Sequence, residues 1–111
     1  QMRPIIDLEQ RNIVAPSQDY TLRFDVVCET RVQRVLAYLN DERIEPPQIP
    51  QPVDVQFKVG DYKIPVPHRV KYEFAIPLRL NRSRNSCRVI ILDENLRWSE
   101  GTTILNVLKP R

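Results

Sequence analysis

The chain has 111 residues, of which 41% are hydrophobic and 28% charged, with two glycines, ten prolines and a formal net charge of +3. This length supports one hydrophobic core, so we expect a single soluble domain spanning residues 1–111. No apolar stretch approaches the roughly 20 residues that cross a bilayer, and no secretory signal pattern is present. We therefore expect no membrane partner.

The residues needed for most catalysis are scarce. The chain has one histidine and two cysteines, and it lacks a glycine-rich phosphate loop, an HExxH motif and clustered metal ligands. We expect no enzyme activity, no cofactor, no metal and no small-molecule substrate. Basic residues concentrate in the C-terminal half, which indicates either an anionic partner or a sheet that faces a negatively charged neighbour.

Alternating hydrophobicity with a period of two predicts strands along the chain. An initial strand is expected near residues 13–15, with 5–8 as a possible addition, and clear alternation marks 22–28, 53–59 and 70–78. Residues 34–39 and 87–92 are more continuously apolar, which is typical of central strands covered on both faces. Residues 102–108 supply a β-branched final strand.

Turn chemistry separates these strands. Residues 40–43 and 81–86 are predicted to be polar turns, and 93–101 a longer loop. A helix is poorly supported because prolines follow the one candidate segment and β-branched residues dominate elsewhere. Short strands at spacings of about 8–12 residues predict an all-β fold, an antiparallel immunoglobulin-like sandwich of about seven strands with Greek-key connections.

Several segments together resemble an immunoglobulin-like or fibronectin-III-like module. They are SQDYTLRFDVVCE at 17–29, RVLAYLND at 34–41, YEFAIPL at 72–78, NSCRVIILD at 85–93 and RWSEGTTILNV at 97–107. More specifically, the chain resembles the accessory domains that accompany caspase-like peptidases in bacterial multidomain proteins, in which one strand reads N-x-I-x-V-x-A-x-D. Asn85, Val89 and Asp93 match that strand, whereas Cys87 and Ile91 depart from it.

The resemblance implies a non-catalytic structural or protein-interaction module within a larger multidomain protein. Its partners would be other domains of the parent protein or a separate protein. No peptidase residue is present to carry over, so the resemblance implies no protease activity for this segment.

Cys28 and Cys87 fall on the strands that carry the inter-sheet disulfide of antibody-type domains. Those strands run in the same direction, and Cys28 ends its strand while Cys87 begins its own, so the two are offset by about 20 Å. A disulfide needs Cα atoms within about 7 Å. We therefore favour two free thiols, keep a disulfide as the alternative, and expect a cytoplasmic location without excluding an extracytoplasmic one.

Two groups of residues are candidate contact sites. Leu96, Arg97 and Trp98 have the composition of a protein-interface hot spot, although Trp98 alternatively covers one end of the sandwich. The guanidinium groups expected near the 81–86 turn suggest an alternative function, contact with nucleic acid or another polyanion. Aromatic residues are not interleaved among them, which favours a solvated or protein-contacting turn. These residues are Arg79, Arg82, Arg84 and Arg88.

Other polar and aromatic residues have ordinary explanations. His68 is expected to be a loop imidazole exposed to solvent, and the carboxylates of Asp41, Glu42 and Glu45 a solvated turn without metal-ligand spacing. The proline-rich segment 45–52 is expected to protect a sheet edge, with a groove ligand as the alternative. Tyr62 is expected to cover one end of the sandwich, with an anchor in a protein interface as the alternative.

Overall fold

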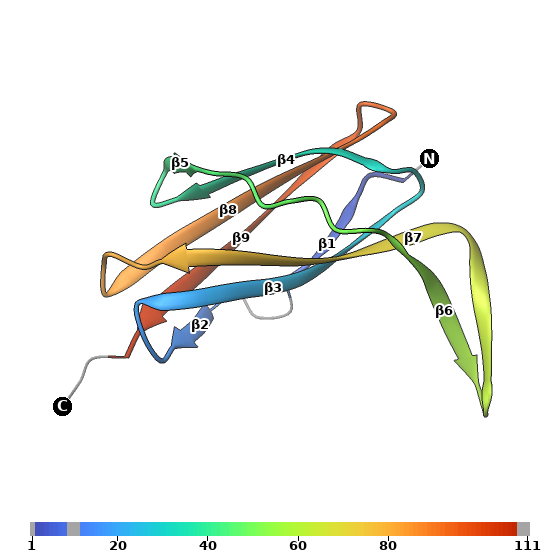
Figure 1. Ribbon diagram of the computed structural model, residues 1–111, viewed down its shortest axis with the longest axis horizontal. Coiled ribbons are helices and arrows are strands. Elements are labelled where there is room, and N and C mark those ends of the chain that lie inside the picture. Colours follow the sequence, from blue (N-terminus) through green and yellow to red (C-terminus); the bar gives the residue numbers. More distant parts are fainter. Residues whose placement is uncertain (1, 9–11, 109–111) are drawn as a thin grey trace.

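Two β-sheets pack face to face, as the computed structural model shows for the residues it describes, 2–8 and 12–108 (Figure 1). One sheet has, in order, β1 (Ile5–Asp7), β3 (Asp19–Cys28), β7 (Tyr62–Arg79) and β6 (Val53–Val59). The other has β2 (Asn12–Ala15), β9 (Trp98–Val107), β8 (Arg84–Asp93), β4 (Val32–Leu39) and β5 (Glu42–Ile44). All neighbours are antiparallel except β2 and β9. The predicted immunoglobulin-like β-sandwich is confirmed.

Residues 2–8 and 12–108 form nine strands in place of the approximately seven expected. The first predicted strand is in fact two, because β1 joins one sheet and β2 the other. The additional short strand β5 lies partly within the predicted turn 40–43. The real turn consists of Asn40 and Asp41, whose φ values of 52° and 65° suit a two-residue hairpin turn. Within the described residues, no helix is present that could cross a membrane.

The core lies between the inner faces of the two sheets. The predicted alternation of 70–78 is confirmed from Tyr72 onward, since every second side chain to Leu78 is buried. The rings of Phe24 and Phe74 stack with centroids 5.4 Å apart, and Phe74 also stacks on Tyr72 at 6.1 Å. The Tyr72 hydroxyl accepts a hydrogen bond from the Val32 N–H at 3.0 Å, which ties the two sheets together.

The strand after the last turn is longer than predicted. The prediction of a loop over residues 93–101 is wrong, because β9 begins at Trp98. The connection between β8 and β9 consists only of residues 94–97. The carboxylate of Asp93 shortens it: Oδ1 accepts hydrogen bonds from the N–H groups of Asn95 at 2.8 Å and Arg97 at 3.0 Å. Side-chain bonds of this kind let a short turn close without a long loop.

The turns on either side of β8 lie at opposite ends of the sandwich (Figure 1). At the end opposite Asp93, the buried side chain of Asn85 links three segments. Its Oδ1 accepts from Asn40 Nδ2 at 3.0 Å and from the Arg82 N–H at 3.2 Å. Its Nδ2 donates to the carbonyls of Arg82 at 2.7 Å and Leu105 at 3.3 Å. The β4–β5 and β7–β8 turns are thereby fixed to β9.

The proline-rich segment 45–52 is the connection between β5, an edge of one sheet, and β6, an edge of the other (Figure 1). Pro46 and Pro47 line a hollow together with core residues Leu39 and Leu78. The segment therefore closes one open side between the sheets, which differs from the edge-protecting role expected from its composition.

Both cysteines are free and buried, in agreement with the favoured prediction. Burial raises the pKa of each thiol from 9.0 to about 11, and the nearby Asp93 carboxylate contributes to the shift of Cys28. Val32, four residues after Cys28, pairs with Asp93, whereas Cys87 pairs with Leu39 at the other end of β4. Asp93 is six residues beyond Cys87, which corresponds to about 20 Å along an extended strand. The predicted offset therefore holds.

We expect Phe74→Ala to lower the free energy of unfolding by about 3–5 kcal/mol, because it removes a stacked ring and leaves a cavity between the sheets. Glu73→Ala, on the exposed face of the same strand, should change it by less than about 1 kcal/mol. Chemical denaturation of both variants measures the difference. Equal losses would contradict the register of β7.

In the folded protein, neither thiol should react with a thiol reagent. Both should react once the protein is unfolded without a reductant. Because their pKa is 9.0 when unfolded and about 11 when folded, the unfolded chain ionises first as pH rises. The buried, protonated thiols therefore contribute to the free energy of unfolding below pH 9, and this contribution is lost as the pH rises towards 11. Denaturation across that range, compared with a Cys28→Ala/Cys87→Ala variant, should reveal a smaller loss in the variant. Finding no thiol in unfolded, unreduced monomer would contradict the strand offset.

Candidate protein-interaction site

The central strand of the five-stranded sheet, β8, and its neighbour β4 carry apolar residues on both faces over part of their length. Val35 and Ala37 of β4 are buried in the core, whereas Leu36 and Tyr38 alternate with them and are half-buried on the other side. β8 repeats the pattern: its residues Val89 and Ile91 face the core, and Ile90 and Leu92 face outward. The prediction that both faces of these strands are covered is wrong for the described part of the chain, because only the inner face packs against another sheet.

Strand pairing gathers the outward side chains into one group. Leu36 lies opposite Ile90, and Leu92 lies opposite Trp98. Residues directly opposite each other in a ladder share a face and touch. We name the outer apolar cluster as Leu36, Tyr38, Ile90, Leu92 and Trp98; the side chain of Trp98 is the most accessible of them, with half of its surface exposed.

Charged groups border this cluster. The guanidinium carbon of Arg88 lies 4.6 Å from the ring centroid of Tyr38, and its Nη1 is 3.4 Å from Glu100 Oε2. Arg34 of β4 lies opposite Leu92 of β8 and also borders the cluster. An apolar centre with aromatic residues and a margin that contains arginine is the composition enriched in protein interfaces.

The structure separates the three predicted protein-contact residues. Trp98 belongs to the outer apolar cluster, and Leu96 is 72% exposed at the tip of the β8–β9 turn with a φ of 61°. Arg97 instead turns towards the N-terminal segment: its Nη1 donates to the Met2 carbonyl at 3.3 Å and lies 3.8 Å from Glu29 Oε2. Arg97 therefore has an intramolecular role that the sequence did not indicate.

The four predicted anion-contact arginines do not form one patch. Arg79 ends β7 and pairs with Asp19 at 3.0 Å, while Arg88 lies in mid-β8 against Tyr38 and Glu100. Arg82 and Arg84 are exposed at the turn. Two of the four guanidinium groups are thus already engaged within the domain.

The remaining candidate residues are exposed. His68 is solvent-accessible, but it lies within β7 rather than in a loop. Tyr62 begins the same strand and does not cover the sandwich. Asp41, Glu42 and Glu45 are exposed as expected, and no group of three or more His, Cys, Asp or Glu side chains in the described residues could hold a metal ion.

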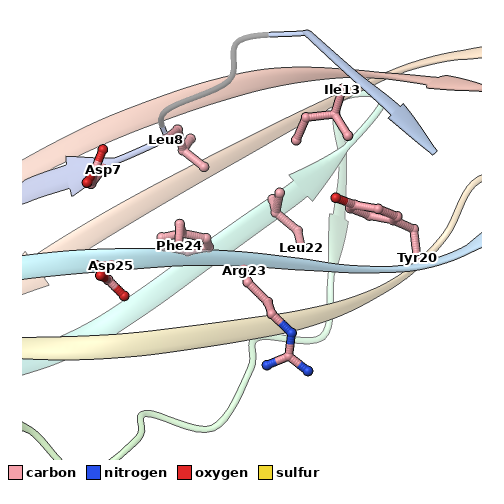
Figure 2. A pocket seen from close by; sticks show the side chains of 8 residues that line it. All are labelled: Asp7, Leu8, Ile13, Tyr20, Leu22, Arg23, Phe24 and Asp25. Atoms are coloured by element: carbon pink, nitrogen blue, oxygen red, sulfur yellow. The ribbon is translucent and has the colours of Figure 1, made fainter.

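A hollow of about 340 Å³ lies beside β1, β2 and β3, and Figure 2 shows the side chains that line it. Leu22 and Phe24 at its base belong to the core, and Leu8 and Ile13 flank residues 9–11, which lie outside the described residues. Its charged residues, Asp7, Arg23 and Asp25, all lie on exposed or half-exposed positions of β1 and β3. We assign no ligand to this hollow.

Four members of the outer apolar cluster, all except Trp98, were absent from the predicted contact residues. Their signal was nevertheless in the sequence, because the runs VLAYL and VIIL leave no polar face. That pattern predicts that both faces of the strands are covered. It does not show whether the outer face packs against the same chain or against another protein.

Comparison with solved structures supports the immunoglobulin-like fold. A chain in the crystal structure of Dpr2 Ig1–Ig2 in complex with DIP-Theta Ig1–Ig3 superimposes with a TM-score of 0.56 and 16% sequence identity. The match covers 96% of this chain and 33% of that one, so this chain corresponds to about a third of the other's length.

A fibronectin(III)-like module of Clostridium thermocellum CbhA aligns with 97% of this chain and 99% of its own, at a TM-score of 0.48 and 14% identity. No protein-family model matches the chain, and no curated protein sequence matches it. At 16% identity, the match to the chain in the Dpr2 and DIP-Theta complex shows the fold alone, an immunoglobulin-like β-sandwich.

Proposed function

We propose that this domain is a non-catalytic protein-interaction module that binds its partner through the outer apolar cluster. The observation that carries the proposal is the two-sided apolar character of β4 and β8 combined with the single packed face of their sheet. A sheet that is solvated on one face normally alternates apolar and polar residues. The exposed half of Trp98 provides a large anchor at the margin of the cluster.

Two further observations support a protein partner. Arginine is enriched in protein interfaces, and three arginines border the cluster: Arg34 lies opposite Leu92, Arg43 lies opposite Tyr38, and Arg88 pairs with Glu100. The structural neighbour described above comes from a complex between two immunoglobulin-domain proteins, which is an interaction of the proposed kind.

The partner, in this proposal, is another domain of a larger parent protein or a separate protein, with caspase-like peptidases as the family context that the sequence pattern suggests. The two free thiols support a reducing, cytoplasmic setting. Contact of Arg82 and Arg84 with nucleic acid or another polyanion is less favoured, since Arg79 and Arg88 have partners inside the domain.

We expect Trp98→Ala to weaken association with the remainder of the parent protein by about 30-fold or more, the loss typical of a hot-spot residue. Titration of the purified domain with separately produced flanking domains, or with the partner protein, measures this loss. Unfolding of the same variant should differ little from wild type, because Trp98 is half exposed.

The control is Arg82→Ala/Arg84→Ala, which alters the exposed turn at the opposite end of the sandwich. It should leave association within about threefold of wild type. Loss of binding in the arginine variant alone, together with salt-dependent retention of wild type on heparin, would replace the proposal with polyanion binding. A Trp98→Ala domain that unfolds would show that Trp98 is part of the core.

A further inference from the structure

A two-stranded arm extends beyond the sandwich, formed by β6 and the first residues of β7 (Figure 1). Asp54 pairs with Val70, but the next pair is Gln56 with Pro65, so one residue of β6 lies opposite four of β7. His68, within those four, has a φ of 58°. A bulge of this kind bends a strand, and here it directs the hairpin away from the sandwich.

One face of the arm is apolar and exposed. Phe57 lies opposite Ile64 and Val59 opposite Tyr62, so the four side chains share a face. Phe57 is 63% and Tyr62 76% exposed. An isolated two-stranded hairpin is marginally stable in water, and three or more strands with an apolar face are needed for independent stability. The arm therefore lacks strands that would complete it.

Both edges of the arm are free among the described residues, because β3 pairs with β7 only from Val70 onward. Pro65 and Pro67 interrupt the β7 edge, so the edge open to pairing is β6, the last strand of the four-stranded sheet. Its sequence, VDVQFKV, contains no proline and only one lysine, the residues that commonly protect sheet edges. Gln56 lies opposite Pro65, which has no N–H, so this pair cannot exchange two backbone hydrogen bonds. The alternation of an antiparallel ladder then directs the N–H and C=O groups of Gln56 and Lys58 outward.

We propose that β6 pairs with β6 of a second copy of this chain, antiparallel and around a twofold axis at Gln56. This register places Asp54 opposite Lys58 of the second copy, and by symmetry Lys58 opposite Asp54 of the second copy, so both charge pairs are complementary. Val53 then lies opposite Val59, and the apolar faces of the two arms become continuous. The arms form one four-stranded sheet.

Charge complementarity selects this register among the alternatives. A shift by two residues places Asp54 opposite Gln56 or Gly60, and parallel in-register pairing places it beside Asp54 of the second copy. A shift by one residue joins the apolar face of one arm to the polar face of the other. Only the register centred on Gln56 satisfies both the charges and the apolar faces.

The test is sedimentation of the whole 111-residue chain as a function of concentration, with a pair of charge variants. Wild type should dimerise. Asp54→Lys and Lys58→Asp should each raise the dissociation constant by roughly 5- to 30-fold, because each puts like charges opposite each other twice. An equimolar mixture of the two variants should form a heterodimer, since all opposing charges are then of opposite sign, and the double variant should recover wild-type association.

A backbone variant tests the same edge independently. Gln56→Pro removes an outward N–H without removing a hydrogen bond to β7, so it should give a folded monomer, whereas Gln56→Thr should dimerise as wild type does. Circular dichroism and unfolding confirm that both variants are folded. Trp98→Ala should not alter self-association, which separates this proposal from the outer apolar cluster.

Several outcomes would overturn the pairing. Wild type could remain monomeric to about 1 mM, the range of very weak association. The dimer could also persist unchanged in Gln56→Pro, or in both charge variants. Failure of the two charge variants to associate with each other more tightly than with themselves would equally exclude the proposed register.

Discussion

The uninterrupted ladder between β3 and β7 is the constraint on which the rest of the sandwich depends. Ten consecutive pairs, from Asp19 with Arg79 to Cys28 with Val70, run without a register shift. A slip of one residue would turn every buried side chain of one strand towards solvent. The stack of Phe24 on Phe74 exists because these two residues are one of the ten pairs. The second sheet packs against a surface that this register defines.

The unequal lengths of the same two strands produce the arm. β3 has 10 residues and β7 has 18, so the first residues of β7 extend beyond the ladder with β3. Their described neighbour is β6 alone, which leaves a two-stranded sheet with no layer packed on its apolar face. The bend at His68 then separates this pair of strands from the core. The arm is thus a consequence of strand length and of one bulge, not of a separate motif.

Period-two alternation was sufficient to predict β3 and the second half of β7 with their buried faces, as the burial of Phe74 and Ile76 shows. The same alternation in β6 predicted the strand, but its apolar side chains are exposed because no layer packs on them. Alternation could not identify β5, because three residues are too few to show a period and the preceding Asn40–Asp41 turn continues the polar run. The extent of the arm was also hidden, since a bulge at His68 leaves no signature in composition. For the candidate site, Trp98 was found by residue type, whereas Leu36 and Ile90 became visible only when pairing brought them together.

The two proposed surfaces are compatible because they belong to different sheets. The outer apolar cluster lies on the five-stranded sheet, whereas the free edge of β6 belongs to the four-stranded one. Pairing through β6 uses the N–H and C=O groups at the edge of the four-stranded sheet. It leaves accessible the outer face of the five-stranded sheet, which contains Leu36 and Trp98. A twofold dimer would therefore present two copies of the cluster in a fixed relation. If a partner also carries two matching sites at that spacing, the second contact becomes intramolecular and avidity rises without any new residue contact.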